Sequence, residues 1–233
     1  MTAAEFAAAV RQYRFDSQSF EPDQLAQAAV SLDRAGLLVV GEPHGVRETP
    51  GVLHALAEAL DTRALALEWT HEEVDDQLQA FVSGEAFDFD LLWTLPPTSD
   101  FFAGDGRVTA GHFALLERLR EEGRLEQAIG FDRLDPVPTP EWQVRDRELA
   151  GRLLAEWNGT RILALTGAFH AQLEPGTMAA HLAEARPGLT PAMLDYGRGT
   201  CWSRGEHDVS GPMPDAPIAF RLPAATPAVV ALQ

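Results

Sequence analysis

The chain contains no lysine, because every one of its 18 basic residues is an arginine. This absence excludes a Schiff-base lysine, a lysine that anchors pyridoxal phosphate and the phosphate-loop lysine of nucleotide hydrolases. The single cysteine, Cys201, excludes internal disulfides and zinc sites built from several cysteines. The Gly-x-Ser-x-Gly elbow of serine hydrolases, the Gly-x-Gly-x-x-Gly of dinucleotide binding and the His-Glu-x-x-His of zinc enzymes are also missing. Any chemistry therefore falls to His, Asp, Glu and Arg.

Basic and long apolar segments are equally scarce. The N-terminus has no basic stretch before an apolar run, and no run approaches the roughly 20 apolar residues of a membrane span. The 35 acids against 18 bases give a net charge of −17, which repels nucleic acid and anionic lipid. We therefore expect a cytoplasmic protein with a small-molecule substrate and neither nucleic acid nor membrane as a partner. The oligomeric state stays open.

What the chain does contain is a regular alternation of short apolar runs and helical patterns. Strands are predicted at residues 37–40, 64–68, 125–131, 161–165 and 191–195. Helices are predicted at residues 3–14, 22–35, 49–61, 70–82, 110–122, 140–157 and 177–185. All-apolar runs are typical of parallel strands buried on both faces, and their alternation with helices indicates an α/β fold. We expect one domain over residues 1–233, a three-layer α/β/α sandwich with a mostly parallel central sheet.

Two segments interrupt this alternation. Residues 84–108 are aromatic, acidic and marked by prolines, which we interpret as a short helix and a long loop that forms a lid over the site. The tail from residue 205 is proline-rich, with one edge strand predicted at 218–222. A stiff connector is predicted at 136–140, with Pro140 opening the next helix.

Polar residues follow four of the predicted strands. Glu42 and His44 follow the first, Glu68 ends the second, and Asp132 and His170 come after the next two. The carboxyl ends of parallel strands share one edge of the sheet, where open α/β proteins place their sites. We therefore expect Glu42, His44, Glu68 and His170 to face one hollow. The structural alternatives are a histidine bonded to backbone and strand-end acids that reach solvent.

His44 is the leading candidate for a general base. A neighbouring carboxylate, from Glu42, Glu48 or Glu68, would raise the pKa of its imidazole and fix its tautomer. Glu68 needs a partner of its own, because a carboxylate is costly to bury alone. Arg47, His44 or a metal ion could serve.

A second set of residues is predicted to contact substrate, and it comprises Glu48, Asp105, Arg107, Asp146 and Trp69. Structural alternatives exist here too. Asp105 and Arg107 lie in a glycine turn that favours Asp for backbone reasons, and Trp69 could belong to the core. Asp146 lies in a helical run of charges of the kind that usually faces solvent. Four histidines within helical patterns are interpreted as surface or packing residues: His54, His71, His112 and His181.

Four segments, in this order, resemble the superfamily of erythromycin esterases, ChaN-like haem-binding proteins and Tiki/TraB-type proteins. Residues 41–48, GEPHGVRE, resemble the esterase signature Gly-Glu-x-x-His-Gly-x-Arg-Glu with one residue fewer between Glu and His, which is closer to the ChaN and Tiki pattern. Glu68 stands where the family carries a glutamate at the next strand end. Residues 145–150 resemble the ChaN-type helix pattern, and residues 165–171 resemble the late Gly-x-x-His strand end.

The resemblance implies an α/β/α sandwich with Glu42, His44, Glu68 and His170 in one cleft. For esterase-like members it implies attack of water on an ester or lactone with histidine as the base. For Tiki-like members it implies a divalent metal and peptide-bond hydrolysis, and for ChaN-like members it implies haem binding without catalysis.

We therefore expect an acid–base enzyme, a hydrolase of an ester, lactone or amide. His44 would take a proton from water and Glu42 or Glu68 would orient it. Arg47 and His170 would stabilise charge on the attacked oxygen. A cyclase or lyase acting on a biosynthetic intermediate with the same residues is an alternative.

A haem- or metal-binding protein without catalysis is the remaining alternative. Candidate ligands for Mn or Zn are Glu42, His44, Glu68 and His170. Candidate haem ligands are Tyr13, Tyr196, His44 and His170.

Overall fold

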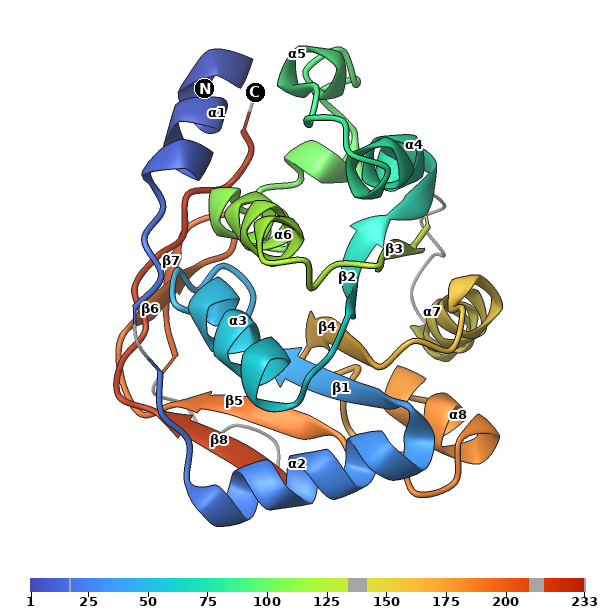
Figure 1. The fold of residues 1–233 in the computed structure, drawn as a ribbon. Helices are drawn as coiled ribbons and strands as arrows, with labels where there is room; N and C mark the ends of the chain where they lie inside the picture. The colour runs from blue at the N-terminus through green and yellow to red at the C-terminus, as the bar shows by residue number, and fades with distance from the viewer. Residues whose placement is uncertain (17, 134–141, 210–215, 233) are drawn as a thin grey trace.

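The centre of the molecule is a parallel sheet. The computed structural model describes residues 1–16, 18–133, 142–209 and 216–232. The strands of the sheet are β1 (Leu37–Glu42), β2 (Ala64–Thr70), β3 (Gln127–Asp132), β4 (Ile162–Gly167), β5 (Ala192–Tyr196) and β8 (Ile218–Leu222). They lie in the order β3-β2-β4-β1-β5-β8, and all neighbouring pairs are parallel. The predicted parallel sheet is confirmed (Figure 1).

Helices cover both faces of this sheet. One face carries α2 (Pro22–Ala35), α3 (Thr49–Ala59), α4 (His71–Val82) and α6 (Ala110–Glu121), and the other carries α7 (Trp142–Glu156) and α8 (Met178–Ala185). In Figure 1, α7 and α8 lie together on the right, whereas α3 and α6 lie to the left of β2. The helix α1 (Ala3–Gln12) packs outside α6. The three layers of the predicted α/β/α sandwich are present.

Alternate side chains of each strand enter different hydrophobic layers. In β1, Leu38 and Val40 pack under α2, α3 and α6, whereas Leu37 and Val39 pack under α7 and α8. All four are fully buried. A strand covered on both faces has no solvent side, which explains why its sequence is an unbroken apolar run.

Local signals at the helix ends are partly confirmed. Gly36 ends α2 in the left-handed region at φ 79°, as its position predicts. Thr70 and Glu73 have the spacing of a capping box at the start of α4, but this capping box does not form. The Thr70 hydroxyl instead donates to Asp100 (3.3 Å), and Glu73 accepts the backbone N–H of Phe101 (3.0 Å). Partners distant in sequence have replaced the local cap.

These contacts anchor the predicted lid segment. It contains a short helix α5 (Phe89–Leu92) and a 3₁₀ turn η1 (Asp100–Phe102). Phe101 and Phe102 are buried against Trp93 and the core. The segment is thus packed in place, and its action as a lid stays a prediction.

The C-terminal tail contains more structure than the sequence indicates. The strands β6 (Thr200–Trp202) and β7 (Glu206–Asp208) form an antiparallel hairpin that was not expected. The predicted edge strand at 218–222 is confirmed as β8. The connector at 136–140 lies outside the described residues. Among those that are described, no helix combines the length and apolar character needed to cross a membrane.

Candidate active site

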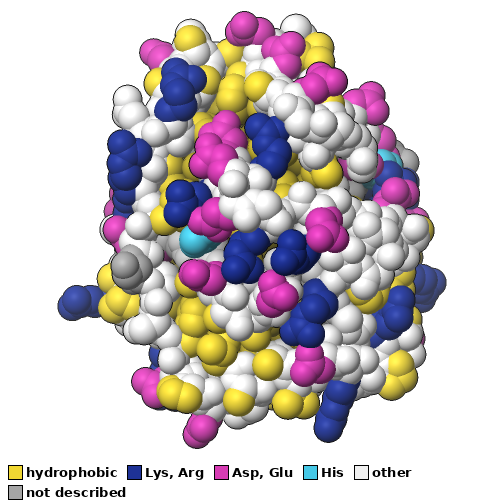
Figure 2. Space-filling model, viewed as in Figure 1, with side chains coloured by type: hydrophobic (Ala, Val, Ile, Leu, Met, Phe, Trp, Pro, Cys, Tyr) yellow, Lys and Arg dark blue, Asp and Glu magenta, His cyan; other side chains and the backbone are white. Residues whose placement is uncertain are grey.

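The strand ends deliver acids and histidines to one edge of the sheet. Glu42 ends β1, Asp132 ends β3, and Glu68 precedes the end of β2 at an irregularity in the pairing with β3. His170 follows the end of β4 by three residues. Figure 2 shows arginine and acidic side chains intermingled over the face of the molecule that is turned toward the viewer. The structure brings together the four residues predicted to share a hollow.

Glu68 is the centre of the cluster and is only 5% exposed. Its Oε2 accepts hydrogen bonds from the Thr166 hydroxyl (2.6 Å) and the Gly167 backbone N–H (2.8 Å). Its Oε1 accepts one from the guanidinium of Arg145 (2.8 Å). Both oxygens are therefore held by donors, as a buried carboxylate requires.

The charge of Glu68 is stabilised by its neighbours. Burial is the largest influence on its pKa and raises it, but the charges of His170, His44, Arg145 and Arg107 together outweigh burial. The pKa lies well below the usual value of 4.5. Glu68 is therefore a fixed anion near neutral pH and a poor base.

Two acid–imidazole pairs converge on this anion. His44 Nδ1 lies 3.1 Å from Glu42 Oε1, and His170 Nδ1 lies 2.8 Å from Asp146 Oδ1. A carboxylate only accepts, so each Nδ1 carries a hydrogen. The two Nε2 atoms lie 3.7 and 3.8 Å from Glu68. In each neutral ring, the lone pair of Nε2 faces the centre of the cluster.

The two imidazoles differ in how they are engaged. His170 Nε2 accepts a hydrogen bond from Arg145 (3.0 Å). His44 Nε2 makes no hydrogen bond with any residue that the structure describes, and it lies against Gly167, where an added Cβ would be 2.9 Å away. His44 also has the more exposed side chain, 22% against 14%. His44 is thus the imidazole with an available lone pair.

The surroundings of His44 favour a basic imidazole. Burial is the largest influence on its pKa and lowers it. The hydrogen bond to Glu42 and the charges of Glu68 and Glu42 outweigh burial and raise the pKa above 6.5. General bases in enzymes are commonly imidazoles next to a carboxylate, which orients the ring and raises its pKa.

Two arginines tie the strand ends together. Arg107 donates to Asp105 (2.9 Å) and to Asp132, and Arg145 donates to Asp132 (2.6 Å) as well as to Glu68. Burial opposes their charge most strongly, yet the surrounding carboxylates raise the pKa of both guanidinium groups. Arg107 and Arg145 are therefore permanent cations next to Glu68.

Arg145 and Asp132 were not among the predicted site residues. Asp132 carried the signal of a strand-end acid, but Arg145 lies in a helical run that resembles a solvated face. Its neighbour Asp146 is fully buried and also accepts the backbone N–H of Met178 (2.8 Å). One feature of the sequence could have indicated Arg145. Several carboxylates at buried strand ends need positively charged partners, and all the Lys and Arg residues of this chain are arginines.

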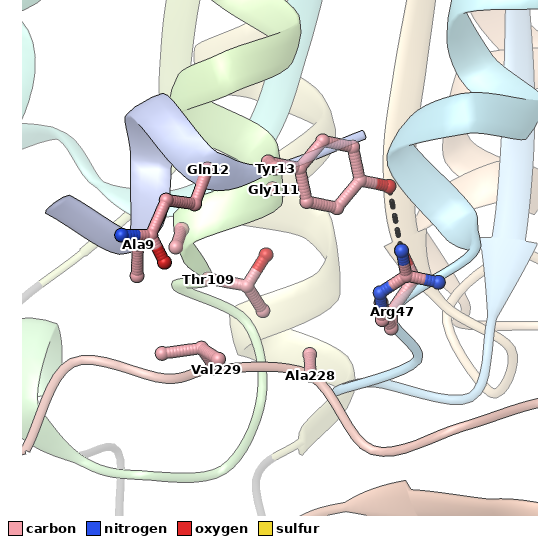
Figure 3. Close-up of a pocket in the computed structure, with 9 residues that line it drawn as sticks. Ala9, Gln12, Tyr13, Arg47, Thr109, Gly111, Ala228 and Val229 are labelled. Atoms are coloured by element: carbon pink, nitrogen blue, oxygen red, sulfur yellow. Dashed lines mark hydrogen bonds between the residues drawn. The ribbon is translucent and has the colours of Figure 1, made fainter. Parts of the chain in front are cut away.

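The structure does not bring Arg47 to the cluster. Its guanidinium lies 3.4 Å from Asp16 and 3.7 Å from Glu48. Figure 3 shows Arg47 beside Tyr13 at a cavity of about 180 Å³, and the Tyr13 hydroxyl donates to the Arg47 carbonyl (2.6 Å). The positive charge near Glu68 comes from Arg107 and Arg145 instead.

The backbone explains this difference. After His44 the chain turns at Gly45, whose φ is 76°, and Val46 then pairs with Pro227. This pairing directs the following residues away from Glu68. Glu48 likewise points away from the cluster and binds the C-terminal tail. It accepts hydrogen bonds from the backbone N–H (2.8 Å) and the hydroxyl (2.6 Å) of Thr226.

The other predicted substrate contacts are divided between the network and the core. Asp105, Arg107 and Asp146 belong to the hydrogen-bonded network just described. Trp69 is 2% exposed and packs on Phe113, with ring centroids 4.8 Å apart. Its Nε1 donates to the Arg107 carbonyl (2.8 Å), so it supports the loop that carries Arg107.

The predicted metal ligands do not fit a divalent cation. Within the described part of the chain, no group of three or more His, Cys, Asp or Glu is arranged to hold a metal ion. The oxygens of Glu68 are bonded to donors, and His170 Nε2 is bonded to Arg145. A dication would also meet two guanidinium groups at close range.

The tyrosines do not fit a haem. Tyr196 is 2% exposed and its hydroxyl lies 3.0 Å from that of Thr49. Burial, the largest influence, places its pKa well above 10. The Tyr13 hydroxyl is bonded to a backbone carbonyl. Neither oxygen is an accessible tyrosinate ligand.

No family model and no curated protein matches the chain. Six chains of solved structures match its fold, among them the following three. An erythromycin esterase in an open conformation is 14% identical with a TM-score of 0.57, and the match covers 94% of this chain and 82% of that one. A Bacillus cereus protein is 9% identical with a TM-score of 0.57, covering 99% and 100%. A toxin effector domain from Vibrio vulnificus is 14% identical with a TM-score of 0.51, covering 81% and 38%.

At these identities the likeness concerns the fold alone. The chain spans only 38% of the length of the toxin chain. The resemblance to the erythromycin esterases is confirmed at the level of fold.

Proposed function

We propose that the chain is a hydrolase of small-molecule esters, lactones or amides in which His44 activates water. One observation carries the proposal. His44 Nδ1 is bonded to Glu42, whereas its Nε2 has no hydrogen-bond partner among the described residues and faces a charged cluster. A positioned base of this kind contributes roughly 10²–10⁴-fold to a rate.

In the proposed reaction His44 Nε2 takes a proton from water as the water attacks the carbonyl carbon. Glu42 accepts the Nδ1–H of His44 and stabilises the imidazolium that forms. The imidazolium then gives its proton to the leaving oxygen or nitrogen. The negative charge that develops on the carbonyl oxygen lies in the field of Arg107 and Arg145.

Glu68 acts as a fixed negative charge in this scheme. Its oxygens accept hydrogen bonds from Thr166, Gly167 and Arg145, and its pKa is low, so it is neither a base nor a free nucleophile. It holds Arg145 and lies close to Nε2 of His44. Its role is to stabilise the protonated form of His44 and to hold the guanidinium of Arg145 in place.

The comparison with solved structures supports the ester class. An enzyme named as an erythromycin esterase shares this fold over most of both chains. The reaction class is proposed from the site, with the shared fold as support.

The test is a panel of activated esters, lactones and amides, incubated with the protein in ¹⁸O-labelled water. A hydrolase places one ¹⁸O atom in the acid product. A product formed without ¹⁸O would favour the cyclase or lyase alternative, and no turnover of any class would contradict the proposal. Titration with haem is expected to leave the Soret band of free haem unshifted, and a stoichiometric shift of that band would favour the haem-binding alternative.

A further inference from the structure

Phe169 is an aromatic residue that the core does not use. All 12 phenylalanines of the chain lie in the described residues, and 11 of them pack in one of the two hydrophobic layers. Phe169 belongs to neither layer, and it is 45% exposed. An exposed phenyl ring forgoes the stabilisation that burial provides. Its apolar surface is therefore available for a contact outside the fold.

Exposed apolar side chains are concentrated on the two segments that border the cluster. Seven large apolar side chains are exposed among the described residues, and three of them are Val144, Phe169 and Leu173. They lie at the start of α7 and in the loop after β4, the segments that carry Arg145 and His170 into the cluster. Single exposed apolar residues are ordinary, whereas a concentration of them beside polar groups is typical of a ligand site.

Trp142 and Phe169 together form what we call the aromatic surface. Their ring centroids lie 4.8 Å apart at an interplanar angle of 74°. Aromatic pairs favour this edge-to-face arrangement. Trp142 is the first residue of α7, and residues three and four positions apart on a helix share one face. Trp142 thus lies on the same helix face as Arg145 and Asp146, which belong to the cluster.

The aromatic surface adjoins the two imidazoles. The ring centroid of Phe169 lies 5.5 Å from that of His170, at an interplanar angle of 83°. A Cβ built on Gly167 would lie 2.9 Å from Nε2 of His44 and 3.6 Å from Cδ2 of His170. Both imidazoles therefore border the same point at the end of β4. A series of short contacts leads from Nε2 of His44 through His170 to the phenyl ring.

The cluster itself consists of polar side chains. Its acids, imidazoles and guanidinium groups bond to one another, as Glu68 does to Arg145 and His170 does to Asp146. Sites for small molecules usually combine a few polar groups of this kind with apolar and aromatic walls. The aromatic surface supplies such a wall next to the polar groups.

We propose that Trp142 and Phe169 form the subsite for an aromatic or extended apolar group of the substrate. The proposal rests on the proposed function and narrows its substrate class to esters, lactones or amides that carry such a group near the carbonyl. The apolar group would lie against the exposed phenyl ring, which places the carbonyl near the two imidazoles. Phe169 has no polar side-chain atom, so it acts on specificity through apolar burial and ring contact.

The first test measures binding without turnover. The probes are ketones that have the shape of esters but cannot be hydrolysed. Benzylacetone matches benzyl acetate, ethyl benzyl ketone matches methyl phenylacetate, and methyl ethyl ketone matches methyl acetate. The readout is the ring resonances of Phe169 in protein labelled with ¹³C at phenylalanine, assigned by their absence in Phe169→Leu.

At least one of the two aromatic ketones is expected to shift these resonances in a saturable way. Its affinity is expected to exceed that of methyl ethyl ketone by about tenfold, because a ring contact adds to the burial of apolar area. The unaltered protein is used, so the result does not depend on a variant that folds. Resonances of Phe169 that respond to neither aromatic ketone would overturn the proposal.

The second test measures selectivity as the ratio of kcat/KM on benzyl acetate or methyl phenylacetate to kcat/KM on methyl acetate. Phe169→Ala is expected to lower at least one of these two ratios by about tenfold. Phe169→Tyr keeps the ring and is expected to keep most of the ratio. Val30→Ala is the matched control, because Val30 is 48% exposed on α2, which contributes no residue to the cluster. Its ratios are expected to equal those of the wild type.

A purely structural role for Phe169 predicts a different outcome. If the ring only supported the imidazole of His170, Phe169→Ala would lower turnover of all three esters equally and leave both ratios unchanged, which would overturn the proposal. The two proposals can fail separately. If an aromatic ketone binds at Phe169 but no ester is turned over, the hydrolase proposal fails and the aromatic subsite stands. If the esters are hydrolysed but neither test responds at Phe169, the subsite fails and the hydrolase stands.

Discussion

The central residues of this protein are two imidazoles with unequal freedom. His44 and His170 each give Nδ1–H to a carboxylate, but Arg145 occupies Nε2 of His170. Among the described residues, Nε2 of His44 makes no hydrogen bond and lies 3.7 Å from the anion of Glu68. In the proposed reaction this asymmetry favours His44 as the base and a structural role for His170.

Replacement of Glu42 by Gln tests the coupling between the two residues. The pKa of His44 is raised in part by the hydrogen bond and charge of Glu42. Because a base must be unprotonated, the rising limb of kcat/KM against pH is expected above 6.5 in the wild type. Glu42→Gln is expected to move this limb to lower pH and to reduce the plateau about tenfold.

Glu122→Gln is the control for this pH profile. Glu122 also pairs with a histidine, His54, at a distance of 2.9 Å, but this pair does not belong to the cluster. An unshifted limb in Glu42→Gln, or an equal shift in the control, would show that Glu42 does not tune His44.

The donor set also predicts the effect of metal removal. Arg145 already donates to Oε1 of Glu68 and to Nε2 of His170, and Thr166 and Gly167 donate to Oε2 of Glu68. Turnover is expected to be unchanged after dialysis against a chelator, with far less than one metal ion per chain by elemental analysis. Activity that is lost on chelation and restored by Mn or Zn would contradict this reading of the cluster.

The sequence indicated the acids of the site better than its cations. Glu42 and Glu68 could be located because a carboxylate at the end of an apolar strand needs a partner. Which arginine supplies the charge could not be deduced. Arg47 lies three residues after His44, but the chain turns away from the cluster at Gly45, whereas Arg145 belongs to a helix more than seventy residues beyond Glu68.

At the scale of elements, prediction succeeded where the signal is local and continuous. The apolar runs that became β1 and β2 are covered on both faces, so the pattern needs no knowledge of partners. The hairpin of β6 and β7 was missed because each strand has only three residues and those of β7 are polar and exposed. The capping box at Thr70 failed because the lid segment supplies better partners for both side chains.

The end of β4 offers a prediction at this scale. Gly167 lies so close to His44 that a Cβ would meet Nε2 at 2.9 Å. Since that atom is the tip of a side chain, Gly167→Ala is expected to cost only about 1–2 kcal/mol of the free energy of unfolding. Displacement of the base by even about 1 Å is expected to lower kcat/KM by about 10². Denaturation and kinetics together check this.

Gly151→Ala is the matched control, because a Cβ there meets nothing within 4 Å and the residue lies within α7. Full turnover in Gly167→Ala would mean that this contact does not define the position of the base.

At the scale of the whole molecule, the buried cluster couples function to stability. Glu68 links β2 to β4 through Thr166 and Gly167 and to α7 through Arg145. Glu68→Gln leaves two half-buried guanidinium groups without this anion and is expected to cost about 3 kcal/mol of unfolding free energy at neutral pH. Asp33→Asn, at an exposed pair with Arg161, is expected to cost less than about 1 kcal/mol.

The sign of the pH dependence follows from the lowered pKa of Glu68. Its charge stabilises the fold fully above 4.5, and this contribution is lost as the pH falls through the lower pKa of the folded state. The difference in unfolding free energy between wild type and Glu68→Gln is therefore expected to narrow below pH 4.5. A difference that stays constant on acidification would mean that Glu68 is not the stabilised anion.

The most direct test of the account is the turnover of His44→Ala beside that of His54→Ala, each measured on a substrate that the wild type hydrolyses. His54 is a partly buried histidine paired with a glutamate on another part of the surface. We predict that His44→Ala loses about 10²–10⁴-fold in kcat while keeping the wild-type fold, and that His54→Ala stays near the wild-type rate. Wild-type turnover in folded His44→Ala would contradict the assignment of the base and, with it, the proposed hydrolase.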